Sequence, residues 1–243
     1  MGKLDPDLAL KAAAHRQEMQ DRYGSEIHLT ALRSKIFSDF VDVPERTACS
    51  EQSLAACDSL SAADRFGEGK TAILNFADYG QAGGRFLDGS HAQEECLCHE
   101  STLFNILDSP ELSGYYKWNR AHKNKGLYEN RAIYSPQVRF SCGKYFDVLT
   151  CAAPYAWAAR RNGVSQEQID AVMADRIHFI HNILEHEMVD TAILGAYGCG
   201  VFRNTPETAA RLFKKEFAAS GIRNVIYAIP GGKNLTVFQQ VFQ

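Results

Sequence analysis

The chain has 243 residues, of which 45% are hydrophobic and 23% are charged, and its formal net charge is -3. This composition is ordinary for a soluble globular protein and excludes a disordered or fibrous chain. The small negative charge gives no support for tight, nonspecific or sequence-specific nucleic-acid binding, although it leaves room for a locally positive pocket. The length is that of one sizeable α/β core with additions.

The cysteines and the hydropathy of the chain indicate the cellular compartment in which the protein works. The seven cysteines are odd in number and irregularly spaced, without a C-x-x-C pair, so neither a disulfide framework nor a zinc knuckle is indicated. A reducing environment fits them best. No stretch approaches the ~18 continuous apolar residues of a membrane span, and the charged N-terminal stretch lacks the apolar segment of a signal peptide. We therefore expect a cytoplasmic monomer that does not contact membranes.

Residues 1–70 are predicted to form a helical extension and a connecting segment that pack on the core. Residues 6–23 are rich in strong helix formers, and the Gly24 that follows predicts the end of that helix. Residues 44–70 are rich in Ser, Ala, Asp and Gly and lack an apolar period, which indicates a connection holding one short helix.

The core is predicted to occupy residues 71–243 and to begin with a buried strand. TAILNFA, from Thr71, is a short apolar run that leads into a glycine-containing loop. Residues 93–107 space their apolar side chains as a helix does. Two runs rich in apolar, β-branched or aromatic residues, at 133–140 and 146–153, predict two further strands.

Strands and helices alternate in the rest of the chain. Residues 166–188 carry an apolar stripe at steps of three and four residues, which predicts a long helix. A strand at 190–196 leads into a second glycine-containing loop, a helix starts at Thr205-Pro206, and residues 225–229 form a last strand. This order predicts a three-layer α/β/α sandwich with a mixed, largely parallel central sheet. Ligands of such folds bind at the carboxyl ends of the strands, where both glycine loops fall.

The second glycine loop suits an anion. Glycines let backbone N–H groups approach phosphate oxygens because no Cβ intervenes, and the N-terminus of the following helix adds free amides and a partial positive charge. We interpret Gly198-x-Gly200 as a pyrophosphate cradle. The alternative is that these glycines only end a strand and turn the chain.

Four ordered blocks resemble the microbial-type poly(ADP-ribose) glycohydrolases over most of the chain from Thr71 onward. The first combines Asn75-Phe-Ala with a glycine loop and then a Gln-Glu-Glu triplet; the others are the runs IYSP at 133–136, TCAAP at 150–154 and LGAYGCGVFRN at 194–204. The resemblance implies a macrodomain-like fold and hydrolysis of the ribosyl O-glycosidic links of poly(ADP-ribose), mainly from chain ends, releasing ADP-ribose. It implies no metal and no cofactor, and partners that are ADP-ribose, its polymer or ADP-ribosylated protein.

The resemblance also assigns roles to residues. Glu95 protonates the departing ribose oxygen and then activates water, while Glu94 holds ribose hydroxyls. Neighbours on a helix point ~100° apart, so the two cannot flank one bond as opposed carboxylates do, and one carboxyl must be both acid and base. Such a carboxyl needs a raised pKa. Residues expected to contact substrate are Asn75, Gly83, Gly84, Arg85, Gln93, Gly195, Ala196, Gly198, Cys199, Gly200, Val201 and Phe202.

Several alternatives stay open. Arg85 stands where the family has a third loop glycine, so it either pairs with a phosphate or narrows the pocket. A mono-ADP-ribosyl-protein hydrolase and a noncatalytic ADP-ribose reader are the rival functions, and the paired carboxylates disfavour the reader. His178 and His181 lie at i and i+3 on the long helix and are interpreted as surface or packing residues rather than metal ligands, because H-E-x-x-H is absent.

Overall fold

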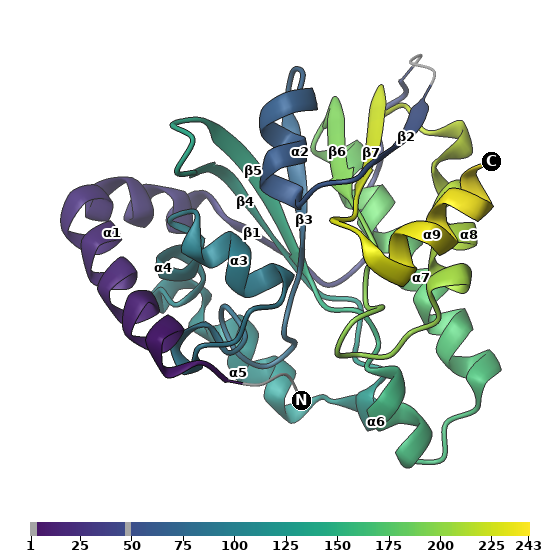
Figure 1. Cartoon of the computed structure of the whole chain (residues 1–243), viewed down its shortest axis with the longest axis horizontal. Helices are drawn as coiled ribbons and strands as arrows, with labels where there is room; N and C mark the ends of the chain where they lie inside the picture. Colours follow the sequence, from purple (N-terminus) through teal and green to yellow (C-terminus); the bar gives the residue numbers. More distant parts are fainter. Residues whose placement is uncertain (1–3, 47–49) are drawn as a thin grey trace.

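A seven-stranded sheet runs through the middle of the protein, and the computed structural model describes residues 4–46 and 50–243 (Figure 1). Its strand order is β1-β4-β5-β3-β6-β7-β2. The strands are β1 (Lys35–Phe37), β2 (Glu51–Ala55), β3 (Thr71–Phe76), β4 (Ala132–Arg139), β5 (Tyr145–Cys151), β6 (Thr191–Leu194) and β7 (Asn224–Ala228). β5, β3, β6, β7 and β2 pair in parallel, whereas β4 is antiparallel to both β1 and β5. The predicted mixed, largely parallel sheet is confirmed.

Helices cover both faces of this sheet. The helices are α1 (Pro6–Arg33), α2 (Ser59–Phe66), α3 (Gln93–His99), α4 (Leu103–Leu107), α5 (Ser113–Ala121), α6 (Ala156–Arg161), α7 (Gln166–His186), α8 (Pro206–Glu216) and α9 (Gly232–Phe242). Alternate residues of a strand serve opposite faces: Ile73 of β3 packs with α1 to α5, while Ala72 and Leu74 pack with α7, α8 and α9. The three-layer α/β/α sandwich is confirmed.

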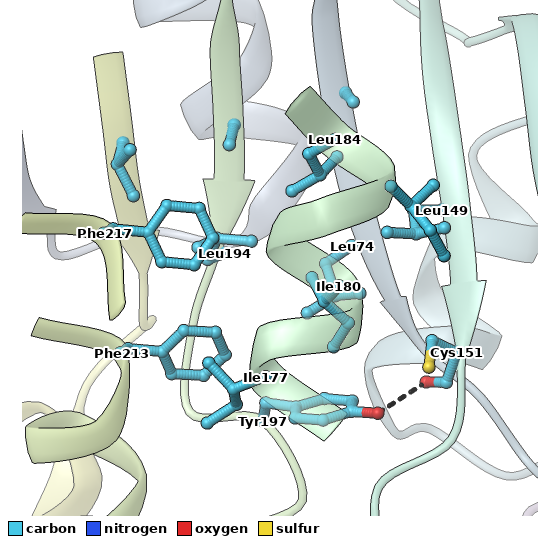
Figure 2. Close-up of a cluster of buried hydrophobic side chains, with 14 of the residues drawn as sticks. Leu74, Leu149, Cys151, Ile177, Ile180, Leu184, Leu194, Tyr197, Phe213 and Phe217 are labelled. Atoms are coloured by element: carbon cyan, nitrogen blue, oxygen red, sulfur yellow. Dashed lines mark hydrogen bonds between the residues drawn. The ribbon is translucent and has the colours of Figure 1, made fainter. Parts of the chain in front are cut away.

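The long helix α7 supplies much of the second core. Its buried Ile177, Ile180 and Leu184 belong to one core cluster with side chains of the sheet and of α8 (Figure 2). Ser165 caps α7: its side chain accepts from the Gln168 backbone amide, and its own backbone amide donates to Gln168 Oε1. The apolar stripe read from the sequence is therefore the face that covers the sheet.

Three local predictions were wrong. The first helix does not end at Gly24; it kinks at Tyr23 (φ -130°) and continues to Arg33, because Ile27 and Ala31 beyond the kink are buried. The helix predicted for residues 93–107 is two helices, separated where Ser101 forms a β-bridge with Phe140.

The third correction concerns residues 44–70. They hold the expected short helix, α2, but also β2, which is paired in parallel with β7 at the edge of the sheet. The other edge strand, β1, and the helices α5, α6 and α9 were not predicted either. Across the described residues, no helix combines the length and hydropathy needed to cross a membrane. The boundary at residue 70 between an extension and a core stays a prediction.

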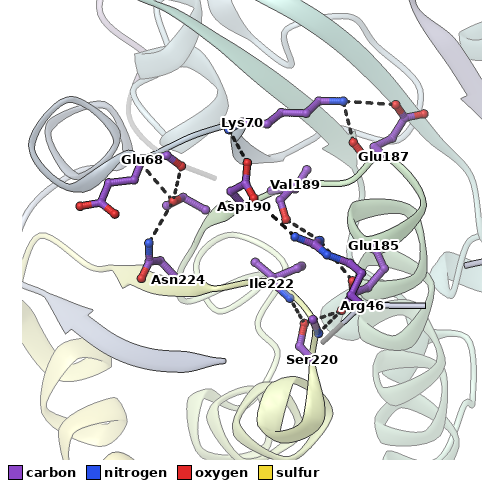
Figure 3. A network of polar contacts seen from close by, with 12 residues as sticks. Arg46, Glu68, Lys70, Glu185, Glu187, Val189, Asp190, Ser220, Ile222 and Asn224 are labelled. Carbon is purple, nitrogen blue, oxygen red and sulfur yellow. Dashed lines mark hydrogen bonds and ion pairs between the residues drawn. The ribbon is translucent and has the colours of Figure 1, made fainter. Parts of the chain in front are cut away.

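β1 and β2 follow each other in the chain but lie at opposite edges of the sheet. The described part of the segment between them, residues 38–46, runs along α7 and is fastened to it. The Val41 backbone amide donates to Asn182 Oδ1 at 2.8 Å, and the Asn182 side-chain amide donates to the Val41 carbonyl at 2.8 Å. Arg46 donates to the Val189 carbonyl at 2.6 Å and pairs with Glu185 (Figure 3). We call residues 38–46 the strap.

Candidate active site

A cleft of about 1050 Å³ opens at the carboxyl ends of β3, β6 and β7. The segments that follow these three strands line it, as expected for an open α/β sheet. Further walls come from the start of α2 and from Leu8 of α1, so residues before 71 also border the cleft. The cleft is large enough for a nucleotide-sized ligand.

Glu94 and Glu95 occupy the first turn of α3 and are buried in the cleft wall, at 3% and 5% exposure. Glu94 accepts hydrogen bonds from the Asn75 side chain at 3.1 Å and from the Asp78 amide at 2.6 Å. Glu95 accepts from the Arg85 amide at 2.9 Å and from the Ala92 amide at 3.0 Å. Each carboxylate oxygen thus has one fixed donor, which holds both groups in place.

Gly84, in the first glycine loop, lies so close to the two carboxylates that a side chain would not fit there. Its φ is +58°, and a Cβ there would lie 2.7 Å from Glu95 Oε1 and 2.9 Å from Glu94 Oε2. Gly83, at φ +64°, would likewise place a Cβ 2.5 Å from the Phe104 ring. Both positions therefore need a residue without a side chain, and Gly84 brings the loop backbone against both carboxylates.

Charge and burial act together on this group of carboxyls. Burial raises the pKa of Glu94 well above its ordinary value, and the nearby charges of Asp78 and Glu95 raise it further. Burial also raises the pKa of Asp78, against hydrogen bonds from the Gly80 and Gln81 amides. The carboxyl of the pair whose pKa is raised is Glu94, the residue predicted to hold ribose hydroxyls.

Asn75 lies behind the two carboxylates, whereas Gln93 lines the cleft beside them. Gln93 accepts from the Phe76 amide at 2.8 Å and donates to the Leu74 carbonyl at 2.9 Å, which fixes α3 to β3. Asn75 is fully buried and donates to both Glu94 and Thr150. In this structure Asn75 orients Glu94, and its position at the end of β3 is that of a positioning residue.

The second glycine loop forms the facing wall. Gly198 has φ +71°, and Asn204 closes the loop by donating to the Gly198 carbonyl at 3.1 Å and the Pro154 carbonyl at 2.8 Å. The backbone amides of Gly200, Val201 and Phe202 have no partner within the described parts of the chain. Three neighbouring free amides before α8 make a cradle suited to an anion.

The remaining predicted contacts fall into two groups. Ala196, Val201 and Phe202 line the cleft, and the Phe202 ring packs against Tyr155 at 4.9 Å between centroids. Gly195 and Cys199 lie behind this lining. A Cβ on Gly195 would come within 2.6 Å of the Ala228 carbonyl oxygen, and the Cys199 thiol faces the Tyr197 carbonyl.

Arg85 fits where the family has glycine because its φ is -105°, outside the left-handed region. The residue lines the cleft, and its side-chain Nε donates to Asp88 at 3.0 Å. Its terminal guanidinium nitrogens have no hydrogen-bond partner among the residues described. The loop therefore keeps its shape while presenting a cation to the cleft.

Sequence reasoning missed Asp78, Ser59 and Leu8 as parts of the site. Asp78 follows the strand that bears Asn75, so its proximity to the site was available from the strand-end rule. Ser59 begins α2 and accepts a hydrogen bond from Gln93. Leu8 lies on α1, and no signal in the sequence connects that helix to the glycine loops.

These features define a macrodomain-like α/β/α domain with two buried carboxylates facing an anion cradle. The family model described as "Microbial-type PARG, catalytic domain" matches residues 9–141, and the chain belongs to this family. The matched range begins inside α1, so the N-terminal helix is included. No curated protein matches the chain.

Solved structures agree with this assignment. The poly(ADP-ribose) glycohydrolase from Thermomonospora curvata is similar over 98% of this chain and 100% of that one, at a TM-score of 0.85 and 23% identity. The enzyme from Deinococcus radiodurans in complex with ADP-ribose is similar over 89% of this chain and 97% of its own, at a TM-score of 0.76 and 27% identity. The Thermomonospora enzyme bound to the inhibitor ADP-HPD aligns over 97% of this chain and 99% of its own, at a TM-score of 0.81 and 23% identity.

Proposed function

We propose that this chain is a poly(ADP-ribose) glycohydrolase that cleaves ribosyl O-glycosidic links, mainly at chain ends, and releases ADP-ribose. The observation that carries the proposal is the buried Glu94–Glu95 pair in the wall of a cleft whose facing wall offers three free backbone amides. An anion cradle alone would serve a reader, but binding a pyrophosphate gives no reason to bury two carboxylates beside it.

Glu95 acts first as acid and then as base. Its carboxyl protonates the ribose oxygen that leaves, an oxocarbenium-like centre forms on the remaining ribose, and Glu95 then takes a proton from the attacking water. Glu94 holds ribose hydroxyls. Burial raises the pKa of Glu94 and so favours its protonated form, which can donate as well as accept.

Three groups bind and orient the substrate in this proposal. The free amides from Gly200 to Phe202 hold the pyrophosphate, with the Arg85 guanidinium nearby. The Phe202 ring packs against the distal ribose. Gly84 lets the substrate and the loop backbone approach both carboxylates.

A side-by-side assay tests the proposal. Wild type, Glu95→Gln and the control Glu167→Gln, an exposed carboxylate at the start of α7, are incubated with labelled polymer and with mono-ADP-ribosylated protein. We expect wild type and Glu167→Gln to release ADP-ribose from the polymer, and Glu95→Gln to lose at least ~100-fold in rate while binding ADP-ribose within roughly tenfold of wild type.

The other outcomes identify the rivals. Release from mono-ADP-ribosylated protein alone would make the chain a mono-ADP-ribosyl-protein hydrolase. Binding without release by wild type would make it a reader. Turnover by Glu95→Gln near the wild-type rate would remove Glu95 from the mechanism.

We also propose that the protein works as a monomer in the cytoplasm. The described cysteines, at positions 57, 96, 98, 142, 151 and 199, are all free thiols, as a reducing compartment favours. Sedimentation of the purified protein and fractionation of its source cells test the two parts separately.

A further inference from the structure

A second group of polar side chains lies on the α7–α8 side of the sheet and takes no part in the cleft. His178 and His181 are one turn apart on α7, and Glu216 is the last residue of α8. The Oε1 atom of Glu216 lies 2.7 Å from His178 Nδ1 and 2.9 Å from His181 Nδ1. Two imidazole nitrogens and a carboxylate oxygen therefore converge on one point.

The hydrogen bonds around His181 determine which of its nitrogens carries hydrogen. Ser220 Oγ accepts from the Ile222 amide at 3.0 Å and donates its single hydrogen to Glu185 at 2.7 Å, in the network of Figure 3. His181 Nε2 faces these same two oxygens, at 3.0 Å from Ser220 Oγ and 3.2 Å from Glu185 Oε1. Neither oxygen has a hydrogen to offer, so Nε2 must be the donor.

It follows that the Nδ1 lone pair of a neutral His181 points at the carboxylate of Glu216. Two groups rich in electrons do not approach to 2.9 Å unless a cation lies between them. A proton can be that cation, and so can a metal ion. The carboxylate of Glu185 behind the ring is the outer partner that usually fixes the tautomer of a metal-binding histidine.

We propose that His178, His181 and Glu216 bind a divalent transition metal of the zinc class. Imidazole nitrogen and carboxylate oxygen suit Zn²⁺, at about 2.0–2.1 Å for nitrogen. Tetrahedral ligands at that distance are about 3.3 Å apart, so the contacts at 2.7 and 2.9 Å must open by a few tenths of an ångström. His178 is exposed and Glu216 partly so, which allows that movement and leaves a coordination position open to water.

The surroundings hold the two rings in place for this role. The Phe217 ring lies 4.5 Å from the His181 ring, and Phe40 of the strap lies 5.0 Å from the His178 ring, between centroids. The metal would join α7 to the end of α8, the helix that starts directly after the anion cradle. This proposal differs from the interpretation of the two histidines as surface or packing residues, because the third ligand comes from a distant part of the chain.

Metal titration of the full, untagged chain tests the proposal independently of glycohydrolase activity. After chelator treatment, Co²⁺ is added while visible absorbance is followed, and Zn²⁺ binding is measured by calorimetry and by the shift in Tm. We expect one Zn²⁺ to bind per chain and Tm to rise when Zn²⁺ is added. The visible absorbance of bound Co²⁺ should be that of an ion with a low coordination number.

Three variants assign the ions to this cluster. His178→Ala and Glu216→Gln should each weaken binding at least tenfold and abolish the Tm rise. His186→Ala is the matched control, since it lies on the same helix but bonds to the Asp42 carbonyl. The proposal is overturned if wild type binds no stoichiometric Zn²⁺ or Co²⁺, or if His178→Ala and Glu216→Gln bind them as tightly as wild type does.

Discussion

At the scale of single residues, the site depends on a contact that the backbone makes, and not a catalytic side chain. The Cα of Gly84 lies against both carboxylates, and amides of the same loop region hold Glu95. Backbone and carboxylates therefore form one rigid unit, and substitutions there act on geometry as much as on chemistry.

We expect Gly84→Ala to reduce turnover by roughly 100-fold, because a displacement of the carboxylates by up to 1 Å costs about that much. The added Cβ would lie 2.7 Å from Glu95 Oε1, so the carboxylate must move. Gly143→Ala is the control, since Gly143 has φ +79° but no atom near its Cβ position. Steady-state turnover on polymer is measured for both variants. An equal loss of turnover in the two would show that backbone strain, and not displacement of the carboxylates, is the cause.

Glu94→Gln tests the raised pKa through stability. A raised folded-state pKa stabilises the protein fully below the ordinary value of 4.5, and this stabilisation is lost as pH rises through the folded-state value. Glu94→Gln cannot ionise and does not lose this stabilisation. The free energy of unfolding of the variant, relative to that of wild type, should therefore increase from pH 5 to pH 9, by about 1.4 kcal/mol for each unit of pKa shift. Urea unfolding across this range measures it, and a difference that does not change with pH contradicts the raised pKa.

Arg85→Ala should weaken ADP-ribose binding about tenfold or more, since a charge-assisted contact contributes about 1.5–3 kcal/mol. The Nε contact with Asp88 leaves the end of the guanidinium available to a phosphate. Calorimetry with ADP-ribose measures the change, and unchanged affinity would refute the contact. Arg85→Gly then tests the alternative: a shift of activity toward polymer over mono-ADP-ribosylated protein would mean that Arg85 narrows the pocket.

At the scale of elements, the two glycine loops differ in what their glycines do. Gly198 has a φ of +71°, which favours glycine, and a Cβ there would lie 2.5 Å from Asn204 Nδ2 of the side chain. Gly200 has open space around its Cβ position and lines the cleft. A substitution at Gly198 would thus disturb the loop itself, whereas one at Gly200 fills the space where a ligand would lie.

We therefore expect Gly200→Val to weaken ADP-ribose binding by more than ~1.4 kcal/mol, a tenfold change, with Tm close to that of wild type. Gly114→Val, at an open glycine of α5 outside the cleft lining, is the control and should bind normally. Calorimetry on both folded variants decides. Wild-type affinity in Gly200→Val would show that this loop does not hold the pyrophosphate.

Elements with a strong pattern were predictable and weakly patterned ones were not. The five inner strands and α7 bury nearly every apolar residue along a face, so their periodicity predicts them. β1 and β2 are short and half exposed, and only pairing with distant strands makes them strands. The site divides in the same way: motifs predicted Glu94 and Glu95, while Leu8 of α1 reaches the cleft through tertiary packing.

At the scale of the whole molecule, the strap carries the chain from β1, at one edge of the sheet, along α7. Asn182→Ala removes both hydrogen bonds to Val41. We expect it to lower the free energy of unfolding by about 1–3 kcal/mol and to leave turnover unchanged, because the cleft opens elsewhere. Urea unfolding and polymer assays measure this, with Asn162→Ala, whose amide makes one exposed bond to Lys125, as control. A loss no greater than that of the control would mean that the strap is not held through Asn182.

The pairing of β2 with β7 also has a consequence for synthesis. Residues 51–55 are made long before residues 224–228, the strand with which they pair in the described structure. At about 5–20 residues per second, the early strand waits many seconds for that partner. An unpaired strand edge promotes aggregation, so during translation we expect this segment to need protection, for example by a chaperone, until residues 224–228 have been made.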